Sequence, residues 1–240
     1  MNAKSQLHTV VDAVRALHLL KPKSFNKQWL VMGHSQGGAA AITVAAYGQK
    51  DAPELDLKGA IALAPGGYQY EGIAEYVQSN PNPEPSVAAF FLIVLLGAQA
   101  AEPSIVPENL VSPEMNTVLT QARSRCLSEL QSDLKKSPSS IFRPNADLKP
   151  LLAYLKKQSI ENMVPTVPLM IVQGSKDHLV DPRGTSAYYQ QLCKLKKPTI
   201  YQTIDGGDHR DALRQSNTFA TSFLNVIEKN QTKSYCSNFK

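Results

Sequence analysis

The chain has 240 residues, of which 42% are hydrophobic and 19% charged, the ordinary composition of a globular protein with a sizeable core. Its net charge is +5, but the basic residues are scattered and no aromatic residues alternate with them, which argues against a nucleic-acid-binding surface. The longest apolar stretch, 87–96, is shorter than the roughly 20 residues of a membrane-spanning helix, and the first residues lack the apolar segment of a signal peptide.

The three cysteines give no sign of a metal or redox site. Cys126, Cys193 and Cys236 lie far apart, without the close pairs of a zinc site or a redox motif. One disulfide with a spare thiol and three free thiols both fit this spacing, so cysteine usage does not decide the compartment. The sequence implies no metal and no organic cofactor.

The N-terminal third alternates between helical and strand patterns. Apolar residues recur at helical spacing over 3–20, which predicts an amphipathic helix. Trp29–Met32 is a short apolar run before a glycine, typical of a fully buried parallel strand. An Ala-rich helix over 39–47 and a second buried strand over 57–64 follow.

The middle of the chain differs from the N-terminal third in its residue composition and in its predicted elements. Between residues 67 and 165 prolines cluster, and no segment is typical of a strand. Helical pieces are predicted over 86–100, 115–136 and 147–158. The block is too long for a plain loop, so we expect a helical lid inserted into the rest of the fold.

The strand pattern returns after Pro168. Strands are predicted over 169–172 and 199–204, which end at Gly174 and Gly206, and a final helix is predicted over roughly 211–228. Strands that alternate with helices predict an α/β fold, a parallel sheet with helices on both faces. The core of this fold is expected to consist of residues 1–66 and 166–240.

One motif carries a specific chemistry. Gly33-His34-Ser35-Gln36-Gly37 stands between a predicted strand and a predicted helix, the setting of a G-x-S-x-G nucleophile elbow. The turn exposes the serine oxygen, and small residues two positions before and after it avoid steric clash. The N-terminus of the helix and the N–H of Gln36 are expected to point at the developing oxyanion. We therefore predict that Ser35 is a nucleophile and Gln36 an oxyanion-hole donor.

A serine nucleophile needs a base that a carboxylate orients. Asp177 follows one predicted strand in Gly174–Asp177, and His209 follows the next in Gly206–His209. Both lie at carboxyl ends of parallel strands, where open α/β sheets place their sites. The order Ser, Asp, His along the chain is that of α/β-hydrolases, which predicts a Ser35–Asp177–His209 triad.

Neighbouring residues compete for these roles. Asp181, four residues further along, is the alternative acid, but Asp177 is favoured because it directly follows the strand-ending turn. Asp208 is interpreted as a solvated turn residue. His34 and His178 are expected to line the site rather than to act as the base.

The motifs together resemble the secretory-lipase family of α/β-hydrolases, which contains the fungal lipase A type and bacterial relatives. The matching segments are Val11–Leu17, Gly33–Gly38, Ala62–Gly66, Gln173–Asp177 and Gly206–His209. The resemblance spans almost the whole chain, and the family carries a helical lid in the position of 67–165. It implies an α/β-hydrolase fold with the triad above.

The chain departs from the family at its start. Family members have a further half-domain before the first helix, with early strands and a second oxyanion donor, whereas this chain begins inside that helix. We interpret it as a crop, a truncated product or a start site assigned too late. We expect the 240-residue form to be poorly soluble and feebly active, and an extended form to be a secreted or periplasmic esterase.

The leading functional prediction is a lipase-like serine carboxylester hydrolase that forms an acyl-enzyme. Its partners would be acyl esters or lipids, with transient contact to a lipid interface and no transmembrane segment. The apolar segment 87–98 is expected to line an acyl tunnel, meet lipid, or form a buried lid helix. Two alternatives remain: a serine peptidase of oligopeptidase type, which the helical lid and the lack of a propeller argue against, and a catalytically silent remnant.

Overall fold

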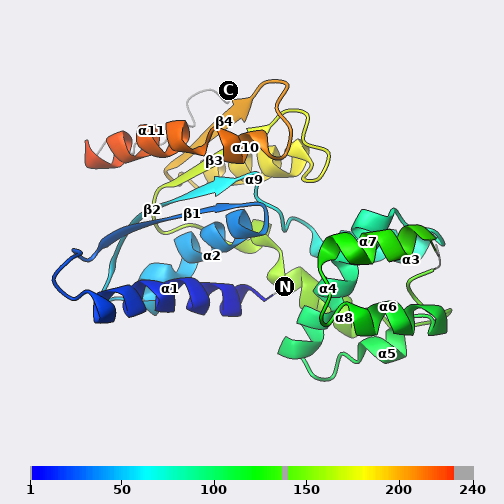
Figure 1. Cartoon of the computed structure of the whole chain (residues 1–240). Coiled ribbons are helices and arrows are strands. Elements are labelled where there is room, and N and C mark those ends of the chain that lie inside the picture. The colour runs from blue at the N-terminus through cyan, green and yellow to red at the C-terminus, as the bar shows by residue number, and fades with distance from the viewer. Residues whose placement is uncertain (1, 137–139, 230–240) are drawn as a thin grey trace. The chain divides into compact units, whose positions relative to one another are not determined.

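Four parallel strands form the central sheet of the computed structural model, which describes residues 2–136 and 140–229 (Figure 1). In spatial order the strands are β1 (Gln28–His34), β2 (Asp56–Leu63), β3 (Leu169–Gly174) and β4 (Thr199–Ile204). Parallel neighbours need a crossover between them, and helices supply it between β1 and β2 and between β3 and β4. The α/β fold class predicted from the sequence is confirmed.

Helices cover both faces of this sheet. One face packs against α1 (Ala3–Leu20), α2 (Gln36–Asp51) and α9 (Pro182–Lys194), the other against α10 (Asp211–Arg214) and α11 (Ser216–Glu228). In Figure 1, α1 and α2 lie below β1 and β2, and α11 lies above these two strands. Side chains along a strand point alternately to opposite faces, so Ala60 and Ala62 join the first cluster while Ile61 and Leu63 join the second. The single helix expected over 211–228 is interrupted at Gln215.

The strand β1 is not the fully buried strand that the apolar run Trp29–Met32 predicts. Only Val31 is buried in β1, and Met32 is 48% exposed. Within the described part of the chain β1 pairs with β2 alone, so it lies at an edge of the sheet. The expectation of full burial was wrong, because burial depends on neighbours that an apolar run does not specify.

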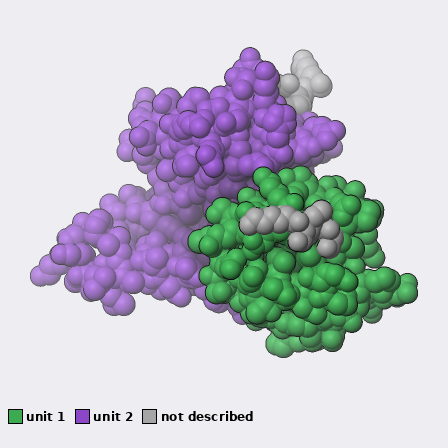
Figure 2. Space-filling view, turned by 45° about the vertical axis from the view of Figure 1, so that its right-hand side comes forward, with its two compact units in different colours: residues 1–2, 69–159 green, residues 3–68, 160–240 purple. Residues whose placement is uncertain are grey.

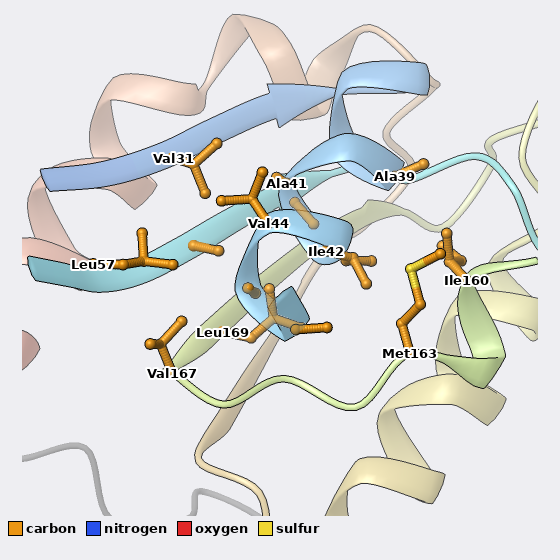
Figure 3. Close-up of a cluster of buried hydrophobic side chains, with 14 of the residues drawn as sticks. Val31, Ala39, Ala41, Ile42, Val44, Leu57, Ile160, Met163, Val167 and Leu169 are labelled. Atoms are coloured by element: carbon orange, nitrogen blue, oxygen red, sulfur yellow. The ribbon is translucent and has the colours of Figure 1, made fainter. Parts of the chain in front are cut away.

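The Ala-rich helix α2 packs closely against the sheet. Its small side chains and Ile42 share a cluster with Val31, Leu57 and Leu169 from three strands (Figure 3). A Cβ added at Gly38 would lie 2.8 Å from the Cα of Pro65, closer than side chains approach a backbone. Small residues therefore let the N-terminal turn of α2 approach the loop that follows β2.

The chain divides into two compact units, which Figure 2 shows in different colours. Unit 1 consists of residues 1–2 and 69–159, and unit 2 of residues 3–68 and 160–240. Unit 2 contains the sheet. Apart from residues 1–2, unit 1 falls within the block 67–165 that we expect to be a helical lid.

Unit 1 is helical and has its own core. Its helices are α3 (Tyr70–Ser79), α4 (Pro85–Ala101), α5 (Pro107–Leu110), α6 (Asn116–Gln121), α7 (Leu127–Lys136) and α8 (Lys149–Gln158). The helix expected over 115–136 is interrupted between α6 and α7, and α3 and α5 were not expected. The apolar segment 87–98 lies in α4, where Phe91, Leu92 and Leu95 are fully buried in the core of unit 1.

The helices and the cysteines can be compared with the expectations about membrane spans and disulfides. No helix in the described ranges combines the length and the apolar character that crossing a membrane requires. Cys126 is exposed and free, and Cys193 is disulfide-bonded. Cys236 lies outside the described residues.

Candidate active site

Ser35 stands on a strained turn between β1 and α2. Its φ of 57° and ψ of −114° lie in a region that residues with a side chain rarely adopt. The surrounding backbone holds it there: the Ser35 N–H donates to the Leu63 carbonyl at 2.9 Å, and the Ser35 carbonyl accepts from the Gly66 N–H at 3.1 Å. The turn is thus clamped by the end of β2, 28 or more residues away along the chain.

The two glycines of the G-x-S-x-G motif have different roles. A Cβ at Gly33 would lie 2.0 Å from the carbonyl oxygen of Gly37, whereas a Cβ at Gly37 would meet no atom within 4 Å. The clash expected at both positions is therefore present only at Gly33. Its missing side chain lets the end of β1 and the first turn of α2 approach each other.

Asp177 and His209 are brought together by the two neighbouring strands β3 and β4. Asp177 follows β3, His209 follows β4, and Gly174 pairs with Ile204 where both strands end. The Oδ2 atom of Asp177 lies 2.8 Å from Nδ1 of His209. Both side chains are largely buried, at 0% exposure for Asp177 and 11% for His209.

The carboxylate of Asp177 is saturated with donors. Its Oδ1 accepts the N–H groups of Leu179 and Val180, each at 2.9 Å, and its Oδ2 also accepts from Nε2 of Gln173 at 2.8 Å. Burial, the largest single influence, would raise the pKa of Asp177. The Val180 N–H, the His209 ring and the Leu179 N–H together outweigh burial, so the pKa of Asp177 lies below its ordinary value. Asp177 is therefore held as an anion beside the imidazole.

The competing residues are occupied elsewhere. Asp181 caps α9, where its carboxylate accepts from the Arg183 backbone and pairs with the Arg183 guanidinium. Asp208 accepts the N–H groups of Arg210 and Asp211 in an exposed turn. His178 is exposed.

His34 links the elbow to His209. Its Nε2 lies 2.8 Å from the backbone carbonyl oxygen of His209, and the two rings lie 4.6 Å apart between centroids. A carbonyl oxygen only accepts, so Nε2 of His34 carries a proton. The residue next to Ser35 thus contacts His209 directly. In the described residues the Ser35 hydroxyl itself makes no hydrogen bond to His209.

Sequence reasoning missed two buried polar side chains behind Asp177. Gln173 of β3 donates to Asp177, and its Oε1 accepts from the Thr185 hydroxyl at 2.9 Å. The available signal was a glutamine at the end of an apolar strand.

Gln36, the first residue of α2, is expected to be an oxyanion donor. The N–H groups of a first helical turn have no acceptor within the helix.

These residues offer no obvious site for a metal ion. Among residues 2–136 and 140–229, no group of three or more His, Cys, Asp or Glu side chains is placed to hold one. What the arrangement provides instead is a strained serine, and a buried imidazole whose Nδ1 faces a carboxylate.

Comparison with known proteins adds a family and a fold. A family model described as secretory lipase matches residues 1–209. Among solved structures, Candida antarctica lipase A in its closed state is similar over 95% of this chain and 55% of its own, at 18% identity and a TM-score of 0.77. The rice cell wall degrading esterase LipA from Xanthomonas oryzae is similar over 94% of this chain and 65% of its own, at 15% identity and a TM-score of 0.71.

These relatives are longer than the chain. The chain spans between half and two-thirds of the length of the two proteins. No curated protein matches it. The structural similarity shows a shared α/β-hydrolase fold.

Proposed function

Since this chain belongs to the secretory-lipase family, a family of lipases and esterases, we propose that it is a serine carboxylester hydrolase acting through an acyl-enzyme. The observation that carries the proposal is the buried hydrogen bond between Asp177 and His209, next to the strained turn that bears Ser35. The serine peptidase that shares this order of residues has no observation in its favour.

In the first half-reaction the Ser35 oxygen attacks the ester carbonyl carbon while Nε2 of His209 takes the serine proton. Because Nδ1 of His209 faces Asp177, the proton of the neutral ring sits on Nδ1 and Nε2 keeps a free lone pair. The Gln36 N–H stabilises the oxyanion. Collapse breaks the ester C–O bond, and His209 returns its proton to the leaving alcohol.

In the second half-reaction water attacks the acyl carbon of the acyl-enzyme. His209 takes a proton from the water and passes it to the Ser35 oxygen as the acid departs. The carboxylate of Asp177 stabilises the imidazolium that forms in each step without itself being protonated, in keeping with its lowered pKa.

The substrate class follows from the family and not from a bound ligand. One relative is named as a lipase and another as a cell wall degrading esterase, so acyl esters are the proposed substrates. We assign the helical block 67–165 the role of a lid that transiently contacts lipid interfaces. A secreted or periplasmic location accords with both assignments.

The proposal is tested with a fluorophosphonate probe and p-nitrophenyl esters. The probe should label Ser35 of the wild-type chain, and Ser35→Ala should abolish both the labelling and the ester turnover above background. Ser124→Ala, at an exposed turn of unit 1, is the matched control and should keep both.

Two results would count against the proposal. Labelling that persists in Ser35→Ala would place the nucleophile elsewhere. A folded wild-type chain that neither reacts with the probe nor turns over esters would mark the silent member of the family considered above.

A further inference from the structure

Gln173 is an unusual residue for its place in the fold. It is the one polar side chain in the sequence of β3, and it is fully buried. Burying an amide without hydrogen bonds is unfavourable, so a buried glutamine needs partners for its donors and its acceptor. The bonds of Gln173 lead to the candidate active site on one side and to α9 on the other.

We infer that Gln173, itself oriented by Thr185, is a positioning residue that aims the carboxylate of Asp177 at His209. The inference rests on the proposed function. Nε2 of Gln173 lies 2.8 Å from Oδ2 of Asp177, the same oxygen that faces Nδ1 of His209 at 2.8 Å. The two lone pairs of this oxygen are thereby directed to two donors.

The two oxygens of Asp177 are held by different means. Oδ1 is held by two backbone N–H groups of the following loop, those of Leu179 and Val180. Rotation about the Cβ–Cγ bond moves both oxygens together, so these bonds already restrain the carboxylate. Gln173 adds a direct restraint on the oxygen that the imidazole uses.

Thr185 determines which way round the Gln173 amide sits. Its hydroxyl, buried in α9, donates to Oε1 of Gln173 at 2.9 Å. This bond holds the amide oxygen toward α9 and leaves the NH₂ group toward Asp177. A flipped amide would set its oxygen against the carboxylate, which repels it. The chain Thr185–Gln173–Asp177–His209 thus transmits one orientation through three hydrogen bonds.

Near-isosteric substitutions test the inference in the full chain. Gln173→Leu removes the donor to Asp177, and Thr185→Val removes the donor to Gln173. Gln173→Leu should lower kcat for p-nitrophenyl esters by about 10–100-fold with little change in KM, the usual cost of a hydrogen bond lost at a charged group. Thr185→Val removes a bond between two neutral groups and should lower kcat by a smaller factor, about 3–10-fold. Thr185→Ser keeps the hydroxyl and should restore most of the rate.

A matched control separates positioning from general damage to the core. Thr43 is also a buried threonine, and its hydroxyl bonds to Ala39 and Met163, away from Asp177. Thr43→Val should therefore leave kcat near the wild-type value. Thermal unfolding of every variant shows which of them are folded at the assay temperature.

Proton NMR of the His209 Nδ1–H gives a readout that needs no turnover. This proton, held in a hydrogen bond to a carboxylate, resonates far downfield, and the signal should shift or disappear in folded Gln173→Leu and Thr185→Val but not in Thr43→Val. If Gln173→Leu does not fold, the Thr185→Val and Thr185→Ser pair decides.

The inference would be overturned if folded Gln173→Leu kept the wild-type rate and an unchanged resonance. If Gln173→Leu does not fold, the same result in Thr185→Val would overturn it. A wild-type chain that lacks esterase activity but shows the resonance would refute the proposed function alone, because the resonance still reports how Gln173 holds Asp177.

Discussion

The two glycines of the G-x-S-x-G motif differ in how closely neighbouring atoms approach them. Gly33 faces the carbonyl oxygen of Gly37 at a distance that admits only a hydrogen, while Gly37 itself borders open space. The sequence motif treats the two positions alike. The structure therefore assigns steric necessity to the first and leaves the second without a packing constraint.

This difference predicts opposite effects on stability. Gly33→Ala forces a methyl group into the backbone of α2 and should lower the free energy of unfolding by about 3 kcal/mol or more. Gly37→Ala adds a methyl group in open space at the start of a helix and should change it by less than about 1 kcal/mol, with alanine's helix propensity in its favour. Urea denaturation of the two variants measures both. Equal losses would show that the turn does not approach as closely as described.

Elements with a strong apolar pattern were predictable from the sequence. All four strands stand within a few residues of their predicted positions. The reason is clearest for β3, which is buried throughout and whose first four residues are consecutive apolar side chains. The helical segments of unit 1 were less predictable. Residues 122–126 break the expected helix 115–136, and α3 was missed beside a run of prolines, because short helices there depend on the core around α4 rather than on their own periodicity.

The sequence predicted the candidate site residues from the positions at which the strands end. Ser35, Asp177 and His209 each follow a strand that the sequence predicts, and the carboxyl ends of parallel strands meet at one edge of the sheet. The contact of His34 with the His209 carbonyl and that of Gln173 with Asp177 were not predictable. Both depend on side-chain directions that only the docked loops define.

The strand β4 contains a buried hydroxyl with no partner in the described residues. Thr199 is fully buried, and its Oγ1 makes no hydrogen bond. Thr199→Val replaces this hydroxyl by a methyl group of the same shape and keeps the β-branched side chain that strands favour. It should raise the free energy of unfolding by about 1 kcal/mol.

Thr185 is the control for this prediction, because its buried hydroxyl does make a hydrogen bond. Thr185→Val removes a hydroxyl that donates to Gln173 and should lower stability. Differential scanning calorimetry of both variants compares the two threonines directly. A destabilised Thr199→Val would show that its hydroxyl has a partner, such as a bound water.

For the molecule as a whole, the buried Asp177 ties stability to pH. Its pKa in the folded chain lies below the ordinary value of 3.8. A lowered carboxyl pKa contributes stability that is present above 3.8 and is lost as the pH falls through the folded-state pKa. The ionised side chain therefore stabilises the fold at neutral pH and ceases to do so in acid.

Comparison with Asp177→Asn isolates this contribution. At about pH 7 the variant should be less stable by about 1–3 kcal/mol, since donors around Asp177 lose a charged acceptor. The gap should narrow as the pH falls below about 4. Asp181→Asn is the control, because an exposed ion pair such as that with Arg183 contributes at most about 1 kcal/mol. Urea denaturation across this pH range measures the gap, and a constant gap would contradict the prediction.

The clamp on Ser35 has a consequence for how the reactive serine can be used. The bonds with Leu63 and Gly66 involve the end of β2 and the loop after it, so no peptide containing residues 33–37 alone can hold the turn. Ser35 in an unfolded or partly folded chain has an ordinary serine conformation and lacks the neighbouring imidazole. Covalent modification of Ser35 by a fluorophosphonate therefore counts the molecules in which β1, α2 and the end of β2 are docked. In a mixture of soluble and misassembled material, the fraction of chains that the probe labels therefore measures the fraction that is natively folded.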